Sequence, residues 1–178
     1  MDTLTFRPAT LTDIPTLIAL VTSAYRGDAS KQGWTTEADM LDGQRIDADA
    51  LRHDIERNDS QILLAMVDQQ VVACAHVAIE DGAGYFGMFA VRPDQQGSGL
   101  GKRVMAEAER IAHQDWELPA MRMAVIDIRD ELIAFYERRG YLLTGIKKPF
   151  PYGDERYGIP KRDDLRFEVL QKTLGTPA

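Results

Sequence analysis

Three runs of strand-forming residues follow one another in the middle of this chain, and they constrain its fold more than any other feature. They cover residues 62–67, 71–79 and 85–91 and consist mostly of aliphatic and aromatic side chains. Short turns at 68–69 and 81–82 separate them. Turns this short join antiparallel neighbours, because a parallel connection needs a crossover of a dozen or more residues. We therefore predict a three-stranded antiparallel meander.

Amphipathic patterns predict helices on both sides of this meander. From Leu100 to Ile111, apolar residues recur at helical spacing with charged residues between them, so that one side of the helix is suited to packing on a sheet. Further strands are expected at 4–8, 121–128, 141–146 and 165–170, and further helices from residue 14 onward, within 47–57 and over 131–139. This order of elements predicts a mixed α/β (α+β) fold, in which helices flank one central, mainly antiparallel sheet.

The overall length and charge exclude several classes of protein. A chain of 178 residues fits one domain, so we expect residues 1–178 to form a single folded unit. A net charge of −7 disfavours nucleic acid and anionic membranes as partners. Cys74 is the only cysteine, and no spacing of His, Cys, Asp or Glu predicts a metal site. With no signal peptide or membrane-spanning run in the sequence, we expect a cytoplasmic protein.

A glycine-rich segment follows the third strand of the meander and leads into the amphipathic helix. Gly97, Gly99 and Gly101 remove side chains where the backbone turns, so several N–H groups can point at one external group. The first turn of the helix carries Lys102 and Arg103, where acidic residues are usual. Free N–H groups, a helix N-terminus and two cations together favour an anion such as phosphate.

Two familiar phosphate-binding loops do not fit this segment. The ATP-type loop needs Ser or Thr directly after its lysine, and the dinucleotide pattern needs a glycine at the position of Lys102. What does fit is Gln96-x-x-Gly99-x-Gly101, the [Arg/Gln]-x-x-Gly-x-[Gly/Ala] signature. With this signature and a second motif at residues 135–141, nearly the whole chain resembles the GNAT superfamily of N-acetyltransferases.

The resemblance implies acetyl-CoA as the cofactor and a sheet that opens between its middle strands to admit it. In proteins of this type the backbone of the glycine turn holds the pyrophosphate, which implies a role for Gln96, Gly97, Ser98, Gly99, Leu100, Gly101 and Lys102. The preceding strand would pair with the pantetheine arm through Phe89, Ala90 and Val91. Many relatives bind that arm with an Asn where this chain has Arg129. Arg129 either contacts the cofactor in its own way or is a surface residue at a helix start.

Acetyl transfer from a thioester to an amine needs a neutral amine, stabilisation of an oxyanion and a proton for the departing thiolate. The resemblance places Tyr136 near the cofactor sulfur, so we expect it to be the general acid, with a core aromatic residue as the alternative. Backbone N–H groups near Ala90 or Val91 would meet the oxyanion. The candidates for the base are Glu80, Glu37 and water, and either glutamate could equally be a solvated surface carboxylate.

The acceptor site gives weaker signals. Residues 37–59 contain eight acidic residues against three basic ones, which would attract a cationic amine or simply form a solvated helix surface. Tyr25 and Trp34 could line an apolar acceptor pocket or anchor a loop. Phe150 and Tyr152 could form the opposite wall of that pocket or belong to a homodimer interface.

Taken together, these features predict an acetyl-CoA-dependent N-acetyltransferase. Its acceptor would be a primary amine of a small molecule or a peptide, attacked directly in a ternary complex. A covalent route through Cys74 is not expected, because this cysteine lies within a strand with no adjacent histidine. The alternative is a non-catalytic acyl-CoA-binding regulatory module of the same fold.

Overall fold

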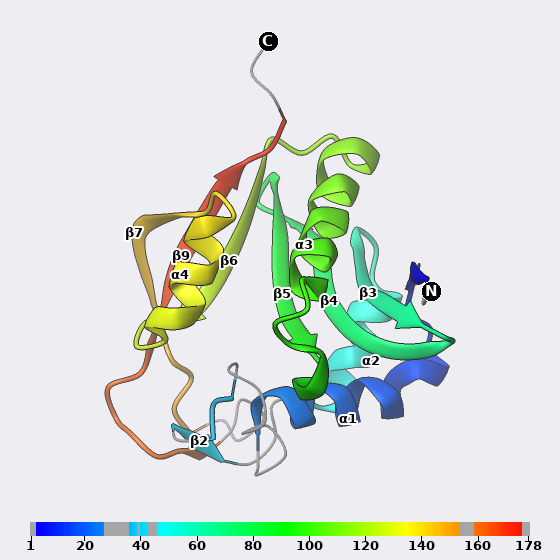
Figure 1. Ribbon diagram of the computed structural model, residues 1–178. Helices are drawn as coiled ribbons and strands as arrows, with labels where there is room; N and C mark the ends of the chain where they lie inside the picture. The colour runs from blue at the N-terminus through cyan, green and yellow to red at the C-terminus, as the bar shows by residue number, and fades with distance from the viewer. Residues whose placement is uncertain (1–2, 27–35, 39, 43–45, 154–158, 176–178) are drawn as a thin grey trace.

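The computed structural model describes residues 3–26, 36–38, 40–42, 46–153 and 159–175. A seven-stranded sheet forms its centre, in the order β1-β3-β4-β5-β6-β9-β7 (Figure 1). The strands are β1 (Leu4–Pro8), β3 (Ser60–Val67), β4 (Gln70–Glu80), β5 (Ala83–Val91), β6 (Ala120–Ile126), β9 (Arg166–Thr173) and β7 (Leu142–Pro149). The flanking helices are α1 (Ile14–Tyr25), α2 (Ala48–Glu56), α3 (Leu100–Arg110) and α4 (Asp130–Arg138). The predicted mixed α/β fold with a mainly antiparallel sheet is confirmed.

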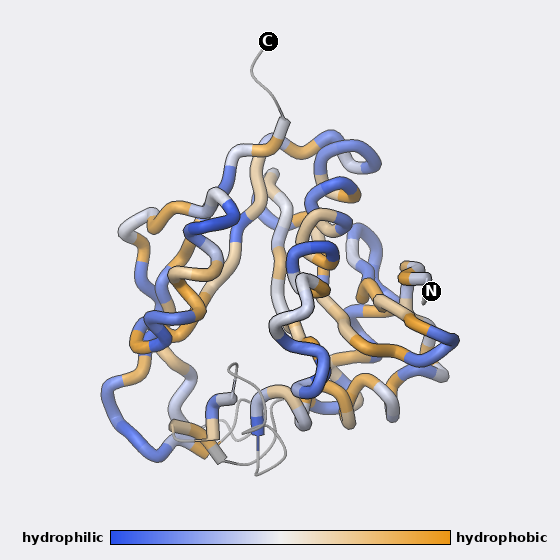
Figure 2. Tube along the Cα trace, in the orientation of Figure 1, coloured by the Kyte–Doolittle hydropathy of each residue, from blue (hydrophilic) through white to orange (hydrophobic). Residues whose placement is uncertain are grey.

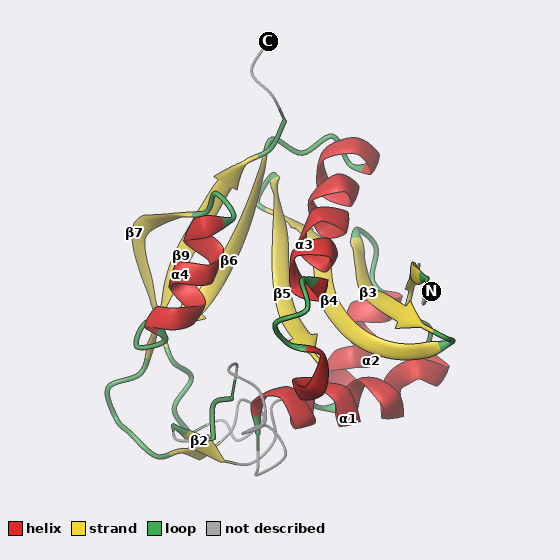
Figure 3. Ribbon diagram, viewed as in Figure 1, coloured by secondary structure: helices red, strands yellow, loops and turns green. Residues whose placement is uncertain are grey.

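The sheet is split at its centre. β3, β4 and β5 form the predicted antiparallel meander. β5 and β6, by contrast, run parallel and pair at just two positions, Gly84 with Met121 and Tyr85 with Arg122. Beyond these two pairs the strands diverge toward the end of β5 (Figure 3). The backbone groups at that end of β5 therefore have a strand partner on one side only.

Helices cover both faces of the sheet. The main core joins Val104 and Met105 of α3 and Tyr136 of α4 to Met121 and Met123 of β6, so α3 and α4 share one face. α1 packs on β4 and β5 of the other face, and α2 packs on β3. Along α3 the hydropathy alternates, as expected of a helix that buries one side (Figure 2). Among the residues that the structure describes, no helix is both long and apolar enough to span a membrane.

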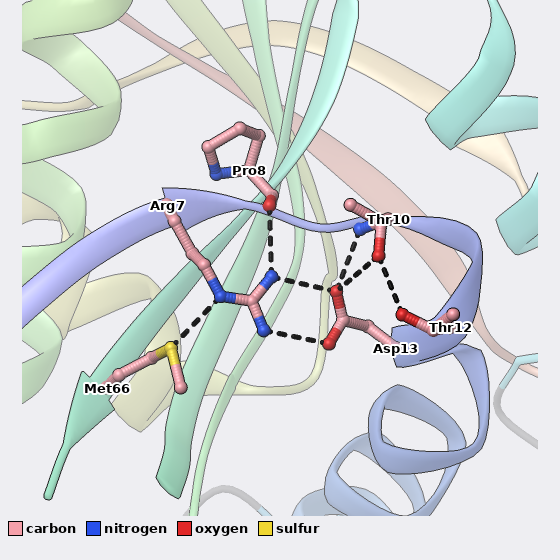
Figure 4. A network of polar contacts seen from close by, with 6 residues as sticks. All are labelled: Arg7, Pro8, Thr10, Thr12, Asp13 and Met66. Atoms are coloured by element: carbon pink, nitrogen blue, oxygen red, sulfur yellow. Dashed lines mark hydrogen bonds and ion pairs between the residues drawn. The ribbon is translucent and has the colours of Figure 1, made fainter. Parts of the chain in front are cut away.

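A polar network joins β1 to the start of α1 (Figure 4). The guanidinium of Arg7 donates to both carboxylate oxygens of Asp13, at 2.9 Å each, and the Thr10 backbone N–H donates to Asp13 Oδ2 at 2.8 Å. These hydrogen bonds lower the pKa of Asp13 to about 2, with the Arg7 side chain as the main cause. The ionised Asp13 thus fixes the connection between the first strand and the first helix.

A small second sheet was not predicted. β2 (Leu41–Asp42) pairs antiparallel with β8 (Ile159–Pro160), across segments for which the sequence indicates loops. The two strands are two residues long, so no periodicity could reveal them. Leu41 packs with Phe150 and Leu165 in a separate core cluster. This cluster connects the segment after α1 to the loop between β7 and β9.

Candidate functional site

β5 carries a bulge where it faces the opening in the sheet. Between the pairs Cys74–Ala90 and His76–Gly87, β5 has one residue more than β4, and Met88 adopts a φ of 45°. After the bulge the backbone N–H groups of β5 again point alternately toward β4 and away from it. The Arg92 N–H shows this, since it donates to the Val72 carbonyl oxygen at 2.9 Å. By that alternation the N–H of Ala90 faces β4, and the N–H of Val91 faces the opening.

The glycine turn between β5 and α3 has the backbone geometry that its sequence predicts. Gly97 and Gly99 adopt φ values of 87° and 85°, and Gly99 is the N-cap of α3. Gly101 is needed for another reason, since a Cβ there would lie 3.0 Å from Cζ of Phe89. The Gln96 side chain donates to the Val91 carbonyl oxygen at 3.0 Å and so ties the turn to the end of β5.

A cavity of about 240 Å³ opens at this turn. It is lined by Phe89, Val91, Gln96, Gly97, Gly99, Gly101, Lys102, Phe135 and Arg138. Seven of these were predicted as cofactor-binding residues, and the sequence reasoning missed Phe135 and Arg138. Of the other predicted residues, Leu100 is buried in the main core, and the Ser98 hydroxyl donates to the Gln95 carbonyl oxygen. Lys102 in the first turn of α3 and Arg138 in the last turn of α4 bring two cations to the N-terminus of α3, which makes this cavity suitable for a polyanion.

A second, smaller pocket of about 60 Å³ lies between the diverging strands. Its lining includes Tyr25, Glu37, Arg129, Tyr136 and Phe167. Tyr136 is buried, and its ring packs against Phe86 and Phe89 of β5, with centroid separations of 6.5 and 6.4 Å. The structure thus brings Tyr136, Glu37 and Arg129 together, although they are far apart in the sequence.

Glu37 and Arg129 belong to a buried charged cluster. Glu37 Oε1 accepts from Arg26, and Glu37 Oε2 accepts from Nη1 of Arg129 at 3.2 Å. Glu37 is 5% exposed and Arg129 is 8% exposed. The two surface interpretations are therefore wrong: Glu37 is not a solvated carboxylate, and Arg129 is not a surface helix-start residue. Arg129 lines the pocket between the strands and does not line the cavity at the glycine turn.

Glu80 lies apart from this group. It pairs in register with Ala83 at the start of β5, six residues before Phe89, or roughly 20 Å along the strand. Its side chain is 49% exposed and forms an ion pair with Arg57 at 3.6 Å. The structure therefore does not bring Glu80 to the pocket that holds Tyr136, and the solvated-carboxylate interpretation fits Glu80 better than a role as base.

Among the described residues of the acidic segment 37–59, Glu37 lines the pocket between the diverging strands, whereas those of α2 do not. α2, which carries Asp54 and Glu56, packs on β3 and α1, and these two carboxylates pair with Arg57 and Arg52. Field steering by α2 is therefore unsupported, because the helix is not next to the pocket. Trp34 lies outside the described residues.

Phe150 and Tyr152, the two aromatic candidates for the opposite wall of the acceptor pocket, have different surroundings. Phe150 is buried against Leu41, Ile126 and Leu165 and does not line the pocket between the strands, so its surroundings support neither the predicted pocket wall nor the dimer interface. Tyr152 is exposed, and its hydroxyl accepts from the Leu165 N–H at 2.7 Å. Both residues stabilise the loop between β7 and β9.

His76 forms a group outside the opening that resembles a catalytic triad in composition. Its Nε2 lies 2.8 Å from the Ser60 hydroxyl, and its Nδ1 lies 3.7 Å from Asp54. The Ser60 hydroxyl, however, donates its proton to the Asp54 carbonyl oxygen at 2.8 Å, so it accepts from His76. A serine held in this way is not an activated nucleophile. No cluster of metal-ligating side chains occurs among the described residues.

One family model matches this chain. The family model described as acetyltransferase (GNAT) family matches residues 28–141. A search of curated proteins finds no significant match to the sequence.

Solved structures share the fold at low sequence identity. The ribosomal-protein-S18-alanine N-acetyltransferase from Escherichia coli is 12% identical, with a TM-score of 0.70 over 99% of this chain and 97% of that chain. The PaiA N-acetyltransferase from Thermoplasma acidophilum, in complex with coenzyme A, is 16% identical, with a TM-score of 0.66 over 96% and 99%. An acetyltransferase of the GNAT family from Streptococcus pneumoniae is 15% identical, with a TM-score of 0.64 over 97% and 100%.

Proposed function

The chain belongs to the acetyltransferase (GNAT) family, and we propose on that premise that it transfers the acetyl group of acetyl-CoA to a primary amine of a small molecule or a peptide. The attack would be direct, in a ternary complex. One juxtaposition supports this most strongly. The cavity at the glycine turn and the pocket that holds Tyr136 meet along the end of β5, where Phe89 lines both.

The first cavity fits the polyanionic part of acetyl-CoA. The positions of Gly97 and Gly99 are open, with no atom within 4 Å of where a Cβ would be, and Lys102 and Arg138 line the same cavity. The N-terminus of α3 adds its dipole, and no acidic side chain occupies its first turn. The backbone of the turn would hold the pyrophosphate, and the pantetheine arm would run along the edge of β5 that faces the opening, beside Phe89 and Val91. When bound, acetyl-CoA supplies the thioester carbonyl for the reaction.

Tyr136 is the residue that we propose as general acid. It is held between α4 and β5 by aromatic packing on Phe86 and Phe89, so its hydroxyl has a defined position beside the opening. A phenol with an ordinary pKa of about 10 can protonate a thiolate whose conjugate acid has a pKa of about 8.5 only when it is held close, which such packing achieves. The N–H of Val91 faces the opening and would donate to the developing oxyanion.

Water is the better candidate for removing the proton from the acceptor amine. Both carboxylate oxygens of Glu37 accept from guanidinium groups, so its hydrogen-bonding capacity is directed to Arg26 and Arg129. Glu80, the last residue of β4, lies beside the start of β5, at the opposite end of that strand from Phe89. Glu37 therefore has a role in organising the pocket, and solvent that enters between the strands carries the proton away.

A combined binding and turnover experiment separates this enzyme from a non-catalytic acyl-CoA-binding module. The melting temperature is measured with CoA, and thiol release from acetyl-CoA is measured with polyamines, amino acids, aminoglycosides and peptide amines. At about 100 times its dissociation constant, CoA stabilises the fold by about 2.7 kcal/mol. We expect this stabilisation together with thiol release for at least one amine. Stabilisation without release for any amine favours the binding module, and no stabilisation contradicts both.

A further inference from the structure

A single hydroxyl group contacts the backbone of β5 at the point where the strand loses its partner. Tyr25, the last residue of α1, is buried, and its hydroxyl donates to the carbonyl oxygen of Phe89. Phe89 directly follows the bulge residue Met88 and lines both cavities. The contact therefore connects α1 to the part of β5 that borders both the cofactor cavity and the pocket of Tyr136.

The contact with Tyr25 helps to fix the orientation of the peptide unit between Phe89 and Ala90. The carbonyl of Phe89 and the N–H of Ala90 belong to one planar peptide unit and point in opposite directions. The register with Cys74 directs the Ala90 N–H to β4, while Tyr25 holds the Phe89 carbonyl on the other side. The unit is thus fixed at both ends. Because Val91 follows it, the direction of the Val91 N–H depends on this unit.

Arg129 extends the contact across the opening to the other half of the sheet. Its guanidinium carbon lies 5.7 Å from the centre of the Tyr25 ring, and its Nη1 is 3.2 Å from Glu37 Oε2. Arg129 is also the N-cap of α4, the helix that carries Tyr136, and its carbonyl oxygen accepts from the Ile133 N–H at 3.0 Å. Arg129 thus contacts Tyr25, which is bonded to β5, and it is also the N-cap of the helix that carries the proposed general acid.

We propose that Tyr25 and Arg129 are positioning residues, which clamp the bulged segment of β5 to the first turn of α4 and so fix the Phe89 peptide unit relative to Tyr136. This inference rests on the proposed function. Neither residue exchanges a proton or contacts the reacting atoms in this account. They act through Phe89 and through α4, and a displacement of about 1 Å between catalytic groups is enough to slow a reaction about a hundredfold.

The test compares two buried tyrosines that each lose one hydroxyl. Tyr25→Phe removes the hydrogen bond to Phe89, and the matched control Tyr141→Phe removes the hydrogen bond that the Tyr141 hydroxyl donates to Glu109 at 3.2 Å. Melting temperature, CoA affinity and thiol release at saturating acetyl-CoA are measured for both, with the amine that wild type uses fastest. We expect similar losses in melting temperature and unchanged CoA affinity. Only Tyr25→Phe should lower kcat, by about tenfold to a hundredfold.

A second pair of variants tests whether the two residues act as one unit. Arg129→Lys keeps a cation near Glu37 but loses the planar group over Tyr25, and we expect a smaller fall in kcat than for Tyr25→Phe. The double variant Tyr25→Phe, Arg129→Lys should be no slower than Tyr25→Phe alone, because both changes release the same clamp. Multiplied effects in the double variant would overturn a shared clamp.

Wild-type kcat in Tyr25→Phe overturns the inference and leaves the proposed function standing. A wild-type protein that binds CoA but releases no thiol with any amine overturns the proposed function, and the inference with it.

Discussion

Arg129 Nη1 lies 3.2 Å from Glu37 Oε2, in a buried ion pair that joins the segment after α1 to the N-cap residue of α4. Glu37 is also paired with Arg26, so one carboxylate stands between two guanidinium groups. Charges this buried are costly unless they are paired, and the two arginines share this carboxylate. The cluster therefore makes the stability of the fold more sensitive to Glu37 than to Arg129.

Removal of the shared carboxylate should destabilise the protein more than removal of one arginine. Glu37→Gln removes the carboxylate that two buried guanidinium groups share and should cost about 3–5 kcal/mol of unfolding free energy. Arg129→Met leaves Glu37 paired with Arg26, so its cost should be at least about 1 kcal/mol smaller. Urea unfolding with equal m-values measures both. Equal losses would contradict the greater sensitivity of the fold to Glu37.

Substitution of Gly99 should separate backbone strain from cofactor binding. Gly99 and Gly82 both have positive φ, at 85° and 77°, and both have open space where a Cβ would lie, but only Gly99 lines the cavity at the turn. Each change to Ala should cost about 1–2 kcal/mol of stability from strain alone. Gly99→Ala should also weaken CoA binding, measured by isothermal titration, and Gly82→Ala should not. Equal CoA affinity in both variants would exclude the turn as the phosphate site.

The meander and the cavity at the glycine turn could be predicted from the sequence, because both depend on local patterns. The meander follows from short turns between strand-forming runs, and the cavity at Gly97 and Gly99 follows from glycine spacing before an amphipathic helix. Glu80 illustrates the limit: its place at a strand end was evident, but its distance from Tyr136 depends on the register of β4 with β5.

The contacts of Tyr25 and Arg129 could not be predicted from the sequence for a different reason. The contact of Tyr25 with Phe89 spans 64 positions and is made to a backbone oxygen, which has no signature in the sequence. The ion pair of Glu37 with Arg129 spans 92 positions, so strand and helix patterns cannot reveal it. The Asn position occupied by Arg129 was the one local signal, and it pointed to the cofactor rather than to the second pocket.

The Asp13 carboxyl should contribute to stability down to strongly acidic pH. Its pKa in the folded protein is about 2, against an ordinary value of 3.8, mainly because Arg7 donates two hydrogen bonds to it. A lowered pKa stabilises the fold above pH 3.8, and this contribution disappears as the pH falls from about 4 to about 2. Arg7 is two-fifths exposed, so the effect should be only about 1 kcal/mol. Asp13→Asn should flatten the stability profile over that interval, and an unchanged slope would contradict the assignment.

His76 should produce a separate loss of stability at mildly acidic pH. Burial lowers its pKa below the ordinary value of 6.5, with Asp54 acting in the opposite direction. The unfolded chain therefore takes up a proton before the folded protein does, so the stabilising effect of neutral His76 is complete above pH 6.5 and falls as the pH decreases. His76→Gln should remove this dependence in urea midpoints measured between pH 7 and pH 5. If the urea midpoint of His76→Gln still falls between pH 7 and pH 5, the loss of stability comes from groups other than His76.

The most direct test of the proposed function is the rate of thiol release by Tyr136→Phe, compared with wild type at saturating acetyl-CoA and with CoA affinity measured in parallel. Loss of the phenolic proton should lower kcat by about a hundredfold or more, because general acid catalysis contributes on that scale, while the packing of the ring on Phe86 and Phe89 keeps the fold and the CoA affinity unchanged. A Tyr136→Phe protein that binds CoA normally and releases thiol at the wild-type rate would contradict the role of Tyr136 as the general acid.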